Sequence, residues 1–269
     1  MDTPEGALDA ALRVARAAGA IQRRGWGRAG EPWSKAAEVD LVTEYDRLAE
    51  AAIVDLLRAR FPDHAILAEE GGARPGDERF RWVVDPLDGT VNFAHGLPLF
   101  AVSVALEVGG ETALGVVLAP MLGWEFVATR DGGATLNGQP IHPSRLALLS
   151  RALLATGFPY DRRTSPVNNF DHFLAFQRRA GGVRRLGAAS LDLCFVACGW
   201  LDGYWELKLS PWDVAAGELM VREAGGRTSD FLGGLPRPDS IVASNGLIHD
   251  DMLAVLRETR DAGVGPFQP

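Results

Sequence analysis

The spacing of hydrophobic and polar positions changes near residue 145, and this change predicts two halves of different architecture. In the first half, apolar residues at helical spacing predict a helix capped by Thr3 and Pro4 and a second helix over about 43–60. Apolar runs then predict successive strands: two that end at Glu69 and Asp85, and others over 100–108, 112–118 and 124–129. Consecutive strands with few helices between them favour an antiparallel sheet.

The second half alternates between the two kinds of element. Strands are predicted at 152–157, 183–186, 204–206 and 241–244, with helices near 168–180, 188–199 and 247–261 and another that begins before Asp213. We therefore divide the chain into an N-terminal half, 1–145, and a C-terminal half, 146–269. This pattern alone indicates an α+β or α/β fold.

The segment Trp82–Phe93 carries the clearest chemistry. An apolar run ends in Asp85, and Asp88 follows three residues later. Mg²⁺ binds through a few carboxylates plus substrate phosphate, so these carboxylates, with a backbone carbonyl between them, are candidate metal ligands. Gly89 permits a turn in which other residues would be strained. The amides of Gly89 and Thr90 open a helical turn that suits a phosphate. An ordinary Asx turn at Asp88 is the competing interpretation.

Two further carboxylates stand where predicted elements end or begin. Glu69 ends a strand beside Glu70, and adjacent carboxylates repel each other unless a cation lies nearby. A solvated loop would explain the same pair. Asp213 follows a serine and a proline that suit a helix start, where a carboxylate favours the helix dipole. It is also the right residue type to complete a two-metal site.

Asp46 has two compatible interpretations. It is the third residue of a helix for which Thr43 is the expected N-cap, which makes an acidic variant of the capping box. It could also polarise Thr90, which would then orient an attacking water.

Composition restricts the functional classes. The chain has 269 residues and a net charge of -8, which argues against a nucleic-acid polymer as substrate. Cys194 and Cys198 lie four apart in an apolar segment with no further ligands nearby, so we expect core thiols and a cytoplasmic location. We expect no signal peptide and no membrane span, since no run approaches ~20 apolar residues.

Together these motifs resemble the inositol monophosphatase family of Mg²⁺-dependent, lithium-sensitive phosphatases. The resemblance runs from about residue 5 to about residue 260 and rests on segments in a shared order: Asp40–Asp46, Glu69–Glu70, Asp85–Phe93, Trp212–Gly217 and Glu223–Gly226. The stretch Gly157–Arg163 is similar to the bacterial branch. The family implies a layered αβαβα sandwich of the inositol monophosphatase and fructose-1,6-bisphosphatase type.

The resemblance also implies the metal ligands. Glu69, Asp85 and the Leu87 carbonyl would hold one Mg²⁺, and Asp85, Asp88 and Asp213 a second. Glu69 would help to hold a third ion.

Catalytic and substrate roles follow from the same resemblance. Thr90, paired with Asp46, would position or deprotonate the nucleophilic water, and Glu69 is the next candidate base. The amides of Gly89 and Thr90 would take phosphate oxygens. The remaining expected substrate contacts are Gly187, Ala188, Ala189 and Glu206, with Lys35 in a loop that covers the site. Many relatives have serine directly after the glycine, where this chain has Ala188.

These roles predict a Mg²⁺-dependent phosphomonoesterase that acts on a small phosphorylated polyol, with inositol 1-phosphate preferred. The alternatives are the same chemistry on fructose 1,6-bisphosphate, histidinol phosphate, a nucleotide or NADP, or a regulatory, partner-binding protein that keeps the fold. The family also favours a homodimer.

Overall fold

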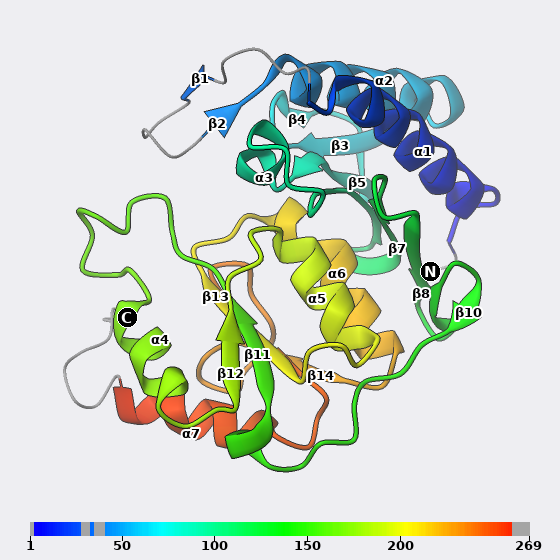
Figure 1. The fold of residues 1–269 in the computed structure, drawn as a ribbon. Helices are drawn as coiled ribbons and strands as arrows, with labels where there is room; N and C mark the ends of the chain where they lie inside the picture. The colour runs from blue at the N-terminus through cyan, green and yellow to red at the C-terminus, as the bar shows by residue number, and fades with distance from the viewer. Residues whose placement is uncertain (1–2, 28–32, 35–40, 260–269) are drawn as a thin grey trace.

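Two β-sheets alternate with three layers of helices in the computed structural model, which describes residues 3–27, 33–34 and 41–259 (Figure 1). The described helices are α1 (Ala7–Gly25), α2 (Glu44–Arg60), α3 (Thr90–Ala94), α4 (Phe170–Gln177), α5 (Ala189–Ala197), α6 (Pro211–Glu223) and α7 (His249–Thr259). Helices α1 and α2 cover the outer face of the first sheet, α5 and α6 lie between the sheets, and α4 and α7 cover the second sheet. This is the predicted αβαβα sandwich.

The first sheet has the strand order β10-β9-β8-β7-β6-β5-β3-β4. Its strands are β3 (His64–Ala68), β4 (Gly72–Arg74), β5 (Asp77–Asp88), β6 (Ala101–Val108), β7 (Glu111–Ala119), β8 (Trp124–Thr129), β9 (Gly133–Leu136) and β10 (Gln139–Pro140). The predicted antiparallel pairing is confirmed with one exception, because β3 and β5 run parallel. The short hairpin from β3 into β4 returns the chain, so that β5 starts beside the beginning of β3.

The second sheet has the order β12-β11-β13-β15-β14. Its strands are β11 (Leu153–Thr156), β12 (Gly182–Arg184), β13 (Gly203–Leu207), β14 (Arg227–Ser229) and β15 (Ser240–Ser244). A short pair, β1 (Trp33–Ser34) with β2 (Leu41–Val42), stands apart from both sheets.

The hydrophobic core between the sheets joins the two halves of the chain. It combines Val117 and Phe126 of the first sheet with Tyr204 and Ile241 of the second, and α5 and α6 fill the space between them. The predicted division at residue 145 falls between the two sheets in sequence and stays a prediction. No helix in the described residues is long and apolar enough to cross a membrane.

Among the boundaries that differ from the sequence prediction, two have a clear physical cause. The first helix begins at Ala7, after Gly6 in the left-handed conformation (φ 73), and no side chain caps it, so Thr3 is not its cap. Strand β5 does not end at Asp85 but continues to Asp88. Its register with β6 shifts between these two residues, where Pro86 lacks the N–H that a regular ladder needs.

Candidate active site

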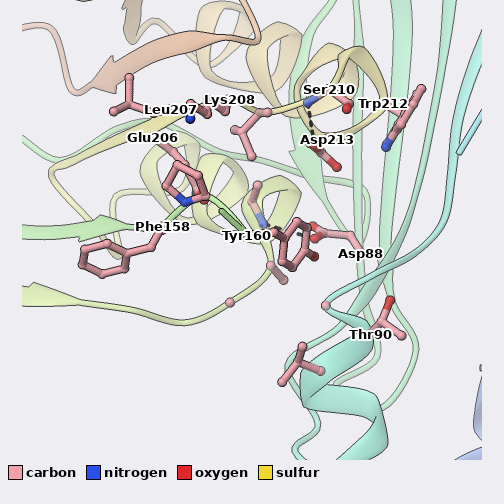
Figure 2. Close-up of a pocket in the computed structure, with 18 of the residues that line it drawn as sticks. Asp88, Thr90, Phe158, Tyr160, Glu206, Leu207, Lys208, Ser210, Trp212 and Asp213 are labelled. Atoms are coloured by element: carbon pink, nitrogen blue, oxygen red, sulfur yellow. Dashed lines mark hydrogen bonds between the residues drawn. The ribbon is translucent and has the colours of Figure 1, made fainter. Parts of the chain in front are cut away.

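A cavity of about 320 Å³ opens where several elements begin or end. It lies beside the end of β5, the N-termini of α3, α5 and α6, and the end of β13. Figure 2 shows Asp88, Thr90, Glu206 and Asp213 around this cavity, each from a different element. Of the predicted site residues, the lining includes Glu69, Asp88, Gly89, Thr90, Gly187, Ala188, Ala189, Glu206 and Asp213.

The parallel pairing of β3 and β5 explains why the acidic end of the cavity forms. Parallel strands end at the same edge of a sheet. Glu69 directly follows β3, and its amide donates a hydrogen bond to the Val84 carbonyl of β5. Asp85 and Asp88 lie at the C-terminal end of β5, at this same edge of the sheet.

Asp88 faces the N-terminus of α5. Its carboxylate accepts hydrogen bonds from the amides of Ala189 (3.2 Å) and Ser190 (2.8 Å) and from the Ser190 hydroxyl. Asp85 is also buried, and its Oδ1 accepts a hydrogen bond from the Leu87 amide at 2.9 Å. Both carboxylates are therefore held in defined orientations.

Asp213 belongs to the predicted helix start. Ser210 is the N-cap of α6 and Pro211 its first residue, as the sequence indicated. The Ser210 amide donates a hydrogen bond to Asp213 Oδ2 at 2.7 Å, drawn as a dashed line in Figure 2. The Asp213 side chain thus both caps the start of α6 and lies beside the cavity.

Burial and the charges of neighbouring carboxylates favour the neutral form of the acidic side chains at this end. Burial, and then the charges of neighbouring carboxylates, raise the pKa of Asp85 well above its usual range. The pKa of Asp213 is raised well above its usual range by burial and then by Asp88. Burial also raises the pKa of Asp88 to about 6, although its hydrogen bonds to α5 act in the opposite direction.

Divalent cations suit this donor set, although the described residues contain no ready-made ligand group. No group of three or more His, Cys, Asp or Glu side chains among them is arranged to hold a metal ion as it stands. The fit rests on hard oxygen donors and on the mutual repulsion of buried carboxylates, which a cation would relieve.

Thr90 and Asp46 are in direct contact, and Asp46 also closes the predicted capping box. The Thr90 hydroxyl lies 3.0 Å from Asp46 Oδ1 and 3.0 Å from the Leu87 carbonyl oxygen. Asp46 Oδ2 accepts hydrogen bonds from the amide (2.7 Å) and hydroxyl (2.6 Å) of Thr43 and so closes the capping box of α2. Burial raises the pKa of Asp46 to about 6.

Gly89 is required by its surroundings. It has a φ of 91, and a Cβ at this position would meet the carbonyl oxygens of Leu99 and Gly187 at 3.0 and 3.3 Å. A side chain would push the end of β5 away from the start of α5. The turn after Asp88 therefore needs glycine for both conformation and space.

Glu206 forms the other end of the cavity. The Tyr204 hydroxyl, two residues away on β13, donates a hydrogen bond to Glu206 Oε2. Burial raises the pKa of Glu206 to about 7, while this hydrogen bond lowers it. Gly157 lies so close that a Cβ there would collide with the Glu206 carboxylate.

Sequence reasoning missed several residues of this site. Arg185, Tyr160 and Lys208 line the cavity but were not predicted as contacts. Ser190 was also missed. The available signal was its place in the first turn of the helix predicted over 188–199. Lys35 lies outside the described residues.

Comparison with known proteins decides the family. The model of the inositol monophosphatase family matches residues 4–261. The chain belongs to this family.

Relatives agree with this assignment over most of the chain. An "Inositol-1-monophosphatase" of Synechocystis sp. is 45% identical, and the match covers 94% of this chain and 89% of that protein. A "Nus factor SuhB" of Pseudomonas aeruginosa is 47% identical over 84% of this chain and 86% of that protein. The structure of an IMPase of Thermotoga maritima superposes with a TM-score of 0.87 at 37% identity, covering 96% of this chain and 99% of that one.

Family membership establishes the general chemistry. The chain is a phosphatase, and the family is generally metal-dependent and points to small phosphate esters as substrates. The cavity, with a crowded acidic end and a separate carboxylate at the other end, is the place where the described residues fit such chemistry.

We expect Asp85→Asn to stabilise the metal-free protein more at pH 8 than at pH 5. The folded pKa of Asp85 lies above the usual 3.8, so the cost of this side chain grows as the pH rises from 3.8 towards the folded pKa and is absent only below 3.8. The gain at pH 8 should be on the order of 1–3 kcal/mol, the scale on which a buried, uncompensated charge acts. Urea unfolding with chelator at both pH values measures it.

The exposed Asp55 on α2 gives a matched control, since Asp55→Asn removes a charge from solvent rather than from the cavity. Equal effects of Asp85→Asn at both pH values, or a loss of stability at pH 8, would contradict the crowding of charges described above.

Proposed function

We propose that this phosphatase is a Mg²⁺-dependent phosphomonoesterase that hydrolyses a small phosphorylated polyol, with inositol 1-phosphate as the preferred ester. One observation carries the proposal: a single cavity has metal-suited carboxylates and Thr90, which contacts the buried Asp46, at one end, and Glu206 at the other. This arrangement suits an ester whose phosphoryl group and alcohol are recognised separately.

The acidic end would hold the metal. In this proposal the ligands are Glu69, Asp85, the Leu87 carbonyl, Asp88 and Asp213, for two ions, with Glu69 also serving a third. Bound Mg²⁺ supplies activated water and neutralises charge on the phosphoryl and leaving oxygens. The raised pKa values of Asp85, Asp88 and Asp213 support a cation here.

Thr90 and Asp46 would orient the attacking water. A threonine hydroxyl is a poor base alone, but Asp46 can accept its proton and set its direction. The 3.0 Å contact between Thr90 Oγ1 and Asp46 Oδ1 supports this pairing. The amides of Gly89 and Thr90 would take phosphate oxygens, and Glu69 is the second candidate base.

The opposite end would bind the alcohol. Glu206 would accept hydrogen bonds from hydroxyl groups, and the backbone of Gly187, Ala188 and Ala189 would line the path to it. From the family resemblance we also propose that the protein is a cytoplasmic homodimer. The relatives named "Nus factor SuhB" favour an added regulatory role as a second candidate function.

Phosphate release from a panel of esters tests the proposal. We expect turnover of inositol 1-phosphate with Mg²⁺ and none with chelator, and a higher kcat/KM for it than for histidinol phosphate, 2′-AMP or NADP. Asp85→Asn should remove at least nine-tenths of kcat, a barrier increase above about 1.4 kcal/mol. Undiminished turnover in this variant would show that Asp85 is not a metal ligand.

Thr90→Ala and Asp46→Asn should each lower kcat by roughly 10²–10⁴, the range for a positioned proton-transfer group. Because the two side chains act together, the double variant should be hardly slower than either single one. Mg²⁺ affinity, measured by calorimetry, should change little in all three. If the two losses multiply, Asp46 acts only as the cap of α2, and Glu69 becomes the first candidate base.

A further inference from the structure

Helix α2 buries a second carboxylate one turn after Asp46. Glu50 is 3% exposed and belongs to the same buried side of the helix as the apolar residues Ala49 and Ile53. A buried carboxylate costs free energy unless hydrogen bonds or a positive charge compensate it. An apolar side chain at this position would avoid that cost, so the partners of Glu50 are informative about its role.

Both carboxylate oxygens of Glu50 contact the turn between β3 and β4. Oε2 accepts a hydrogen bond from the Glu70 amide at 2.7 Å, and Oε1 accepts one from Arg74 Nη2 at 3.2 Å. Gly71 lies against both side chains, because a Cβ there would lie 2.5 Å from Arg74 Nη2 and 2.5 Å from Glu50 Oε1. The Glu50 carboxylate thus connects α2 to this turn and to the end of β4.

The same turn carries Glu69. Residues 69–71 form the loop of the β3–β4 hairpin. The Glu69 amide donates a hydrogen bond to the Val84 carbonyl of β5 at 3.2 Å, and the next amide, that of Glu70, donates to Glu50. The backbone is therefore held on both sides of the Glu69 Cα, by β5 before it and by α2 after it.

A fixed turn matters because of what the proposed function asks of it. Glu69 from this loop and Asp85 from β5 would hold the same ion, so the loop has to keep one position relative to β5. Loops are usually more mobile than the strands that they connect. Groups that hold a metal ligand in place typically change metal affinity by roughly 10–100-fold when they are mutated.

We propose that Glu50 is a positioning residue for metal binding: by holding the β3–β4 turn, it keeps the Glu69 carboxylate in place to bind a cation together with Asp85. This inference deepens the proposed function and rests on it, since it takes Glu69 as a metal ligand. Glu50 is not among the described residues that line the cavity, so it acts through the turn rather than on the ester.

Glu50→Gln tests the inference. The amide keeps the size of the side chain, but only one of its two terminal atoms can accept a hydrogen bond, and it carries no charge. We expect Mg²⁺ to bind roughly 10–100-fold more weakly in calorimetry. In the metal-free protein, hydrogen exchange of the Glu70 amide, followed by NMR, should be faster by about tenfold or more. Phosphate release should need more Mg²⁺ and recover when Mg²⁺ saturates the site.

Glu107→Gln is the matched control. Glu107 is a half-buried carboxylate on the same sheet, and its Oε2 lies 2.7 Å from Arg81 Nε and 2.6 Å from Arg81 Nη2. The variant also removes one charge from an arginine pair, but it leaves the β3–β4 turn untouched. Its Mg²⁺ affinity and its Glu70 exchange rate should equal those of wild type. Equal losses in Glu107→Gln and Glu50→Gln would reduce the effect to general charge or stability and overturn the inference.

A double-mutant cycle shows whether Glu50 acts through Glu69. Glu69→Gln should itself weaken Mg²⁺ binding, and adding Glu50→Gln to it should change the affinity by less than about twofold. If the two losses multiply instead, Glu50 influences the site by another route and the inference is overturned. Should Glu50→Gln fail to fold, Arg74→Gln replaces it in the same cycle, since the Arg74 side chain is 33% exposed.

The inference and the proposed function fail in different ways. If wild type binds no Mg²⁺, or if Glu69→Gln binds it as tightly as wild type, the proposed metal site fails and the inference fails with it. If wild type binds Mg²⁺ and releases phosphate, but Glu50→Gln binds Mg²⁺ equally well, only the inference is overturned. Unchanged exchange of the Glu70 amide in Glu50→Gln would also overturn it, because the turn would not depend on Glu50.

Discussion

Repulsion among buried carboxylates is the constraint on which the site depends. Asp85, Asp88 and Asp213 come from two elements far apart in sequence, and the fold brings them to one end of the cavity, with Asp85 and Asp88 buried and Asp213 half-buried. Such an arrangement opposes folding unless protons or a cation compensate the charge. A bound metal cation would compensate this negative charge. This agrees with a family that is generally metal-dependent.

Carboxylates of the site also accept hydrogen bonds from backbone amides at the starts of helices. Asp46 closes the capping box of α2 and contacts Thr90, and Asp213 accepts the amide at the start of α6. Asp88 receives the first amides of α5. Each carboxylate is thus held by the start of a helix, whose amides favour negative charge. Helix ends from both halves of the chain meet at this cavity and orient the groups that the chemistry would use.

The local features of the site could be predicted from the sequence, because short segments determine them. The turn after Asp88 and the capping residues Thr43 and Ser210 follow from residue types at fixed spacing. The contact of Thr90 with Asp46, 44 residues away in sequence, was expected from the family resemblance instead. The parallel pairing of β3 and β5 could not, since it depends on how the β4 hairpin folds back. The layered order of helices and sheets came from the family resemblance rather than from periodicity.

Residues that act through tertiary placement were also missed. Arg185 looked like one arginine among many, and only the fold puts it in the cavity wall against Gly187. The absence of a side-chain cap at Gly6 had no sequence signal either, because Thr3 and Pro4 are plausible helix starters. Spacing predicts which groups share a turn or helix, whereas distant strands and loops meet according to packing.

Calorimetric titration of Mg²⁺ in buffers of different ionisation enthalpy tests the central claim most directly, because it counts the protons released as the ion binds. If crowded carboxylates form the cation site, binding at pH 6.5 should release protons, since the pKa of Asp88 is about 6 and those of Asp85 and Asp213 are raised further above their usual range. The release should decline as the pH is raised. Mg²⁺ binding without proton release at pH 6.5, or no binding at all, would contradict the account.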